Sequence, residues 1–170
     1  MLIDDCPHSF ADLAAVVLPA HMAKLRAALK SPHAAATFSV PGSGPKTIAK
    51  AIGQASDFSG CYTLIEGSAP VYVGISRGVL ARLRQHFLGK THFDASLAYA
   101  IAKRRSPTPG QRAQAMALPA FQKAFAEAQK YLRTLSVAFV EIANPLELYV
   151  FEAYAAMELA THQWNTFRTH

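Results

Sequence analysis

Five side chains in the last two thirds of this chain have the types and the spacing to do chemistry on a phosphate ester. In chain order they are Tyr62, Tyr72, Arg82, His86 and Glu152. A guanidinium offers fixed, charged donors to phosphate oxygens, and an imidazole can move a proton near neutral pH. A carboxylate can hold a hard divalent cation, and a phenol can orient a water molecule. Their joint use depends on the elements that carry them.

Glu152 lies in an apolar helical segment, which makes it the most unusual of the five. Its neighbours at three and four positions are Leu148, Tyr149, Ala155 and Ala156. An ionised carboxylate held without a partner in such a stripe would cost several kcal/mol. We therefore expect Glu152 to sit at an edge, to meet a cation or to be protonated. A bound Mg²⁺-like ion and a structural arginine both meet this requirement, whereas Glu147 and Glu158 are expected to be solvated helix charges.

Arg82 and His86 are four residues apart in a predicted helix over 78–88. We expect them on a different face from the apolar stripe of Leu80, Leu83 and Phe87. Such a face suits phosphate binding, although the pair by itself is more typical of an ordinary solvent-exposed helix surface. Nearby cations extend the positive surface and are expected either to contact a nucleic-acid backbone nonspecifically or simply to be solvated; they are Arg77, Arg84 and Lys90.

Tyr62 and Tyr72 lie in two β-branched and aromatic runs, 61–65 and 71–75, which flank a turn signal around Gly67. This pattern predicts a β-hairpin. A loop of three or five residues would place the tyrosines directly opposite each other on one face. A loop of two or four residues would place them on opposite faces. Both tyrosines also suit ordinary packing in a core.

The rest of the pattern predicts helices around this hairpin. They are expected near 10–30, where Pro19 would kink or divide the helix, and near 47–52, 94–105, 121–132 and 146–163, with a third strand over 135–142. The predicted fold is α+β. It consists of a small, mainly antiparallel three-stranded sheet, made of the hairpin and the later strand, which is flanked by helices and preceded by an N-terminal helical extension.

Composition favours a soluble globular protein with a polyanionic partner. Hydrophobic residues make up 51% of the chain and charged residues 16%, with a formal charge of +6. Such an excess favours nucleic acid, because each neutralised phosphate releases counterions, although it could equally serve solubility. Cys6 and Cys61 form no metal or disulfide pattern. The acidic start and the lack of a long apolar run predict a cytoplasmic protein that does not bind membranes.

From Ser59 to Phe167 the chain resembles the GIY-YIG endonucleases. Gly60-Cys61-Tyr62 is similar to the first tripeptide of that family, and Tyr72-Val73-Gly74 is similar to the second. The segment 77–87 resembles the helix that carries the family's arginine and histidine, and Glu152 matches its metal-binding glutamate. Trp164-Asn165-Thr166-Phe167 resembles the terminal asparagine motif. The implied organisation is an N-terminal helical extension and linker over 1–58 and a nuclease domain over 59–170, with a helical insertion at about 94–132, all in one compact unit.

The resemblance implies a metal-dependent endonuclease that hydrolyses phosphodiester bonds in DNA through a single divalent ion, with RNA not excluded. Glu152 would hold Mg²⁺ or Mn²⁺, and Arg82 would bind the phosphoryl oxygens. Tyr62 or Tyr72 would orient or deprotonate the water, and the sequence leaves that choice open. His86 would relay the proton or support a tyrosine. Gly60, Gly74 and Asn165 would support the site structurally.

Two other functions fit parts of the sequence. The first is a catalytically silent nucleic-acid-binding module on the same fold, although a pure binder has no reason to keep a carboxylate near phosphates. The second is an unrelated α+β enzyme for small phosphorylated metabolites. The sequence leaves open the structure of the DNA substrate, its sequence specificity and the oligomeric state.

Overall fold

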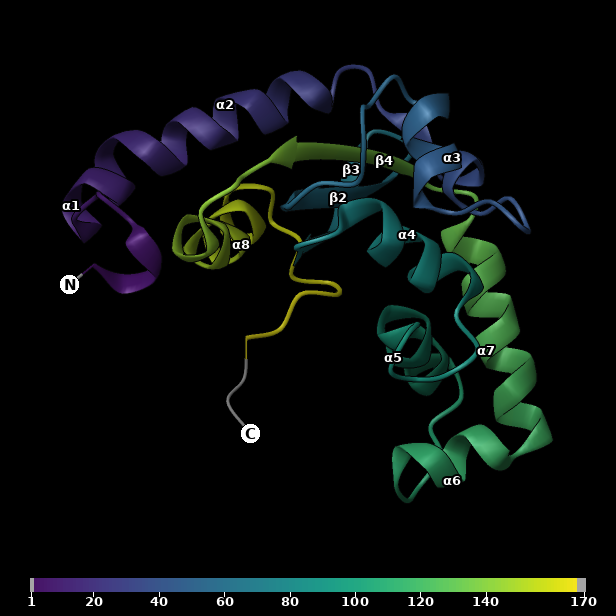
Figure 1. Ribbon diagram of the computed structural model, residues 1–170. Helices are drawn as coiled ribbons and strands as arrows, with labels where there is room; N and C mark the ends of the chain where they lie inside the picture. The colour runs from purple at the N-terminus through teal and green to yellow at the C-terminus, as the bar shows by residue number, and fades with distance from the viewer. Residues whose placement is uncertain (1, 168–170) are drawn as a thin grey trace. The chain divides into compact units, whose positions relative to one another are not determined.

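A computed structural model describes residues 2–167 (Figure 1). The chain divides into two compact units. Unit 1 comprises the residues up to His33, Asp57–Val79 and the residues from Ser136 onward. Unit 2 comprises Ala34–Ser56 and Leu80–Leu135. The predicted boundary between residues 58 and 59 falls inside a segment of unit 1. The last three residues of the predicted nuclease domain, 168–170, lie outside the described range.

The sheet confirms the predicted α+β class. Its strands are β1 (His33–Ala34), β2 (Gly60–Glu66), β3 (Ala69–Ser76) and β4 (Ser136–Glu141), arranged in the order β1-β4-β2-β3. β2 pairs antiparallel with both β3 and β4, as expected for a hairpin and a later strand. The expected count of three strands was wrong by one. The extra strand, β1, has two residues, which is too short to produce a sequence pattern.

The hairpin combines a two-residue turn with a β-bulge. Glu66 pairs with Ala69 across the turn, and Gly67 has a φ of +61°, as at the first turn position of a type II′ hairpin. The register shifts between Leu64 and Ile65, so that Tyr62 pairs with Gly74 and Leu64 pairs with Tyr72. A two-residue turn alone would put the tyrosines on opposite faces. The extra residue of the bulge returns both tyrosines to the same face. Tyr72 then lies opposite Leu64, two residues along β2 from Tyr62.

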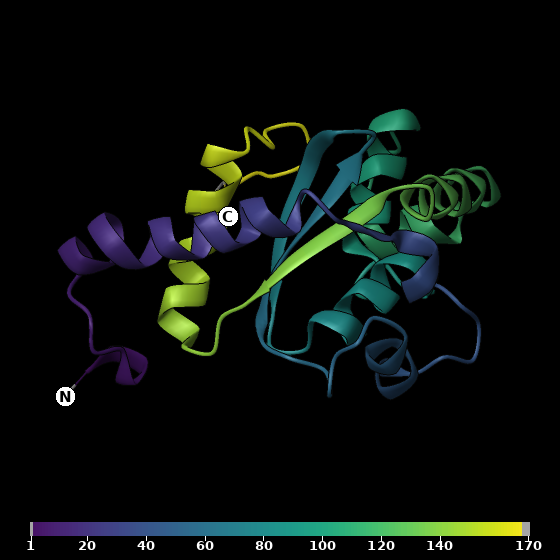
Figure 2. The ribbon, with the colours of Figure 1, turned by 90° about the horizontal axis from the view of Figure 1, so that it is seen from above.

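A long N-terminal helix runs over Phe10–Ala28 and is one continuous rod in Figure 2. It consists of α1 (Phe10–Asp12), a π-helical stretch over Leu13–Val17, and α2 (Leu18–Ala28). The π stretch ends two residues before Pro19. Because proline lacks an N–H and crowds the carbonyl of the preceding turn, a wider turn accommodates it without breaking the helix.

One face of the sheet packs against α2 and α8 (Pro145–Glu158). Cys61, Ile65 and Val73 of the hairpin lie on this face, and they are buried with Leu25 and Phe151 in a single apolar cluster. Alternation along the strands places Tyr62 and Tyr72 on the other face.

Unit 2 is helical. Its elements are a 3₁₀ helix (Ala35–Phe38), α3 (Pro45–Ala51), α4 (Val79–Leu88, which starts at the last residue of unit 1), α5 (Ser96–Arg105), α6 (Arg112–Ala117) and α7 (Pro119–Leu132). α5 packs against α7, and α7 contacts α6. Side-chain bonds to the end of α4 complete the unit: Arg133 donates to the Phe87 carbonyl at 3.1 Å, and Gln129 donates to the Gly89 carbonyl at 2.7 Å.

Candidate functional site

The two tyrosines lie together, but they differ in exposure. Their ring centroids are 6.3 Å apart. Tyr62 is 1% exposed, whereas Tyr72 is half-buried. The Tyr62 ring lies over Gly74, since a Cβ at Gly74 would lie 2.5 Å from the phenol oxygen. The absence of a side chain at Gly74 therefore lets the Tyr62 phenol extend across β3, the edge strand of the sheet.

Gly60 allows a different close approach. A Cβ at Gly60 would collide with the carbonyl oxygen of Val140 in β4. Glycine is thus needed at position 60 because the backbone of β4 passes too close for a Cβ. At position 74 it is needed because the Tyr62 side chain occupies the space that a Cβ would take.

Asn165 binds the free edge of β3 as a neighbouring strand would. Its Oδ1 accepts from the Val73 N–H at 2.9 Å, and its Nδ2 donates to the Val73 carbonyl at 2.8 Å. Val73 therefore directs both backbone groups away from β2. The ladder repeats every second residue, so Ile75 also directs its N–H and carbonyl outward. No residue type marks the outward N–H of Ile75, because this donor belongs to the backbone.

We expect Asn165→Ala to lower the free energy of unfolding by about 2 kcal/mol, because it leaves two backbone groups of Val73 without partners. Denaturant unfolding monitored by circular dichroism measures the change. Thr166→Ala, at the exposed neighbouring position, is the matched control and should stay within about 0.5 kcal/mol of the wild type. An unchanged denaturation midpoint for Asn165→Ala would show that the pairing adds no stability.

Glu152 is a half-buried carboxylate with no hydrogen bond or ion pair to any residue that the structure describes. Burial raises the pKa of this carboxyl above its ordinary value. The pKa of the buried Cys61 thiol is also raised, first by burial and then by the charge of Glu152. That interaction places Glu152 near β2, on the face of the sheet that α8 covers.

The other two carboxylates of α8 have partners. Glu147 accepts from His21 Nε2 at 2.9 Å and lies 3.7 Å from His8 Nε2. Glu158 pairs with Arg26 at 2.8 Å. The expectation that Glu147 is simply solvated was wrong, because the N-terminal helix packs against α8 and supplies the histidine. Glu152 alone among these three acids lacks a counter-charge.

The phenols and Glu152 therefore approach the sheet from opposite faces. They have β3 in common: Tyr72 projects from it, the Tyr62 ring lies over its Gly74, and α8 packs on it. Of the predicted site residues in unit 1, the structure therefore brings the two phenols together on one face of the sheet and places Glu152 on the other.

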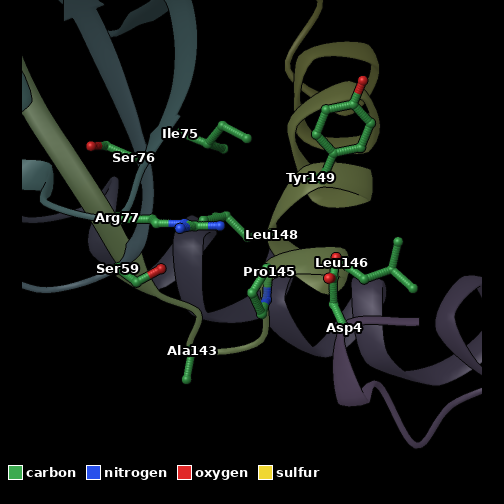
Figure 3. A pocket seen from close by; sticks show the side chains of 10 residues that line it. All are labelled: Asp4, Ser59, Ile75, Ser76, Arg77, Ala143, Pro145, Leu146, Leu148 and Tyr149. Atoms are coloured by element: carbon green, nitrogen blue, oxygen red, sulfur yellow. The ribbon is translucent and has the colours of Figure 1, made fainter. Parts of the chain in front are cut away.

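Arg77 follows β3 and lines a cavity of about 520 Å³ at the start of α8. Figure 3 shows its side chain reaching across the cavity toward Leu148. Leu148 and Tyr149 precede Glu152 by one helical turn, and Ile75, which also lines the cavity, pairs with Cys61. Arg77 is exposed and forms no ion pair within the described residues. Unit 1 thus places a cation and Glu152 on the same side of the sheet.

Arg82 lies in unit 2, where it holds the loop before α5. Its Nη1 donates to the Asp94 carbonyl at 2.9 Å and to Gln85 Oε1 at 3.2 Å, and its Nη2 donates to Ser96 Oγ at 2.9 Å. A guanidinium has five N–H donors. The N–H of Nε and one N–H of Nη2 remain for another acceptor.

His86 is fully buried, so the expectation that it lies outside the apolar face of α4 was wrong. Burial, with the nearby charge of Arg82, lowers the pKa of His86 to about 3, so the ring is neutral at physiological pH. His86 follows the buried Val79 by seven residues, or two helical turns, and this spacing is the signal in the sequence that indicates its burial.

The remaining predicted cations of α4 and its following loop have different environments. Arg84 is half-buried, and its Nε donates to the Ser43 carbonyl at 2.7 Å, which ties α4 to the loop before α3. Lys90 is exposed and lines a second cavity, within unit 2.

No group of three or more metal-ligating side chains occurs within residues 2–167. Within the described residues, a metal site built on Glu152 would therefore have at most two ligands of the types His, Cys, Asp and Glu. None of the helices described is long and apolar enough to cross a membrane. Comparisons with protein-family models, with curated proteins and with solved structures found no match to this chain.

Proposed function

We propose that this protein is a metal-dependent endonuclease that hydrolyses phosphodiester bonds in DNA through a single divalent ion. The observation that carries the proposal is Glu152, a half-buried carboxylate without a counter-charge among the described residues. Desolvating such a group is unfavourable, and a bound cation offsets this cost.

The donor set fits Mg²⁺ or Mn²⁺. Mg²⁺ takes oxygen ligands and is commonly held by one or two protein carboxylates, with water and substrate phosphate completing its coordination. Glu152 would provide the protein ligand. A bound ion would stabilise the charge that develops on the phosphate and on the leaving oxygen.

The side chains of unit 1 divide the remaining work. Arg77 is exposed, lies on the same side of the sheet as Glu152, and offers charged donors to a phosphate oxygen. Tyr72 is the more exposed phenol, so we assign it the orientation of the attacking water. Tyr62 is buried beside it and acts as a positioning residue that fixes the Tyr72 ring. In unit 2, a neutral buried His86 suits a supporting role better than proton relay, and Arg82 keeps two donors for the substrate backbone.

Removal of metal ions is expected to abolish cleavage. Supercoiled plasmid incubated with the protein and Mg²⁺ or Mn²⁺ should convert to nicked circles, as measured by agarose-gel electrophoresis. EDTA should stop the conversion, and excess Mg²⁺ should restore it, because a lone carboxylate and an arginine do not neutralise the transition state. Nicking that persists in EDTA, or no nicking with either metal, contradicts the proposal.

A catalytically silent nucleic-acid-binding module is the second candidate. It is favoured by the three hydrogen bonds that already engage Arg82 within the protein. This function predicts that the protein retards DNA in a gel with or without Mg²⁺ and leaves the plasmid supercoiled.

A further inference from the structure

The charge of this protein is divided very unevenly between its two units. Unit 2 contains twelve Lys and Arg and two Asp and Glu, which gives a formal charge of +10. Unit 1 contains five Lys and Arg and nine Asp and Glu, which gives −4. The two values add to the +6 of the whole chain. A polyanion is therefore attracted to unit 2 and repelled by the net charge of unit 1.

Unit 2 also has an aromatic cavity. The cavity has a volume of about 430 Å³, and it is lined by residues of the loop before α5 and by residues of α6 and α7, among them Lys90, His92, Phe93, Met116 and Phe125. Phe93 is 75% exposed, and its ring lies against that of His92 with a centroid distance of 4.0 Å. The loop thus holds the Phe93 ring at the cavity, where it is largely exposed to solvent and packs against the His92 ring.

Two exposed cations, Lys90 and Arg112, lie at or near this cavity. Lys90 lines it and is exposed. Arg112, also exposed, precedes the lining residue Ala113 and places its Cζ 5.5 Å from the centre of the Tyr99 ring. The Tyr99 ring in turn lies 5.8 Å from that of His92. Neither cation forms an ion pair within the described residues.

An exposed aromatic ring at a cavity with nearby cations suits single-stranded nucleic acid. Unpaired bases stack on aromatic side chains, and the flanking phosphates bind nearby Lys and Arg. The bases of an intact duplex are stacked on each other and cannot enter such a cavity. We propose that this cavity takes an unpaired base of a single-stranded stretch of DNA, stacked on Phe93, with Lys90 and Arg112 on the adjacent phosphates. The proposal rests on the proposed function for the nature of the substrate.

Phe93→Ala tests the stacking contact without removing a charge. Fluorescence anisotropy of the full chain is measured in EDTA, with a labelled single-stranded oligonucleotide and with a duplex of the same sequence. The variant should bind the single strand about tenfold more weakly, which corresponds to about 1.4 kcal/mol. Its duplex affinity should change by less than about twofold. The dependence of single-strand affinity on salt should keep its slope, since no phosphate contact is lost.

Two further variants complete the experiment. Phe93→Trp keeps a stacking surface and should bind the single strand as tightly as the wild type or more tightly. Phe10→Ala removes a ring that is 72% exposed in unit 1 and should leave both affinities unchanged. The proposal is overturned if Phe93→Ala retains wild-type affinity for the single strand, if both affinities fall equally, or if the wild type binds no single strand.

The outcome is separable from that of the proposed function, because the binding assay contains no metal. A protein that shows the Phe93 effect but never nicks plasmid supports the cavity and refutes the nuclease. A protein that nicks plasmid but shows no Phe93 effect refutes the cavity alone.

Discussion

Glu152→Gln is expected to lower the rate of plasmid nicking by at least about a hundredfold. Glutamine keeps the size of the side chain but loses the charge that would hold a divalent ion, so the developing negative charge on the phosphate is no longer offset. The measurement is the rate at which supercoiled plasmid disappears at saturating Mg²⁺. The variant is purified in parallel, so that it also controls for a contaminating nuclease.

The same substitution is expected to stabilise the metal-free protein. Burial raises the pKa of Glu152, so the folded state disfavours its ionised form. The wild type therefore loses stability relative to Glu152→Gln as the pH rises from the ordinary carboxyl pKa of 4.5 through the raised value. In EDTA at neutral pH the variant should unfold at a higher temperature, and the difference should vanish near pH 4.

Glu158→Gln is the matched control, with the same substitution in the same helix at an exposed, ion-paired position. It should leave nicking unchanged and alter stability by less than about 1 kcal/mol. If Glu152→Gln nicks plasmid as fast as Glu158→Gln, Glu152 does not hold the catalytic ion. If Glu152→Gln is less stable than the wild type in EDTA, its carboxylate has a partner that stabilises the fold.

Gly74→Ala should destabilise the protein by about 3 kcal/mol or more. The new methyl group would lie 2.5 Å from the phenol oxygen of Tyr62, whose ring is buried and would have to move within a packed interior. Because the obstacle is a side chain, Tyr62→Leu should relieve it. A double-mutant cycle measured by urea unfolding should therefore give a favourable coupling energy of at least about 1 kcal/mol between Gly74→Ala and Tyr62→Leu.

Gly60→Ala provides the contrast. Its methyl group would meet the backbone carbonyl of Val140, which no side-chain substitution can move. Combining it with Tyr62→Leu should bring no recovery beyond additivity, to within about 0.5 kcal/mol. Equal rescue of both glycine variants would mean that Tyr62→Leu loosens the sheet in general. No rescue of Gly74→Ala would mean that the Tyr62 ring is not the obstacle.

The hairpin shows where sequence patterns reach their limit. The two runs around Gly67 predicted both strands and the turn, because two runs of β-branched and aromatic residues that flank a glycine are typical of a β-hairpin. Whether the tyrosines share a face depends on a single residue in the register. The bulge, which leaves Val71 unpaired between Pro70 and Tyr72, puts both tyrosines on the same face. No residue type in the sequence marks the position of this bulge.

α4 and α8 show the same contrast for the candidate site. The apolar surroundings of Glu152 in the sequence predicted an unusual carboxylate, and the structure describes one that is half-buried without a partner. His86 was expected outside the apolar stripe of Leu80, Leu83 and Phe87, but it is buried. Its burial depends on packing around α4, which a helical period alone does not specify. The hydrogen bond between Glu147 and His21 joins residues that are 126 positions apart, so no local sequence pattern predicts it.

The order of the two units along the chain has a consequence for synthesis on the ribosome. Every residue of unit 2 has been made by Leu135, whereas β4 and α8 of unit 1 are translated only afterwards. Until then the edge of β2 that pairs with β4 in the finished sheet is unpaired, and the hairpin face bearing Cys61, Ile65 and Val73 lacks the cover of α8. A nascent chain thus carries an exposed apolar surface and an open strand edge, and chaperones recognise both features. Nascent chains stalled shortly before β4 are the species in which aggregation of this protein would begin.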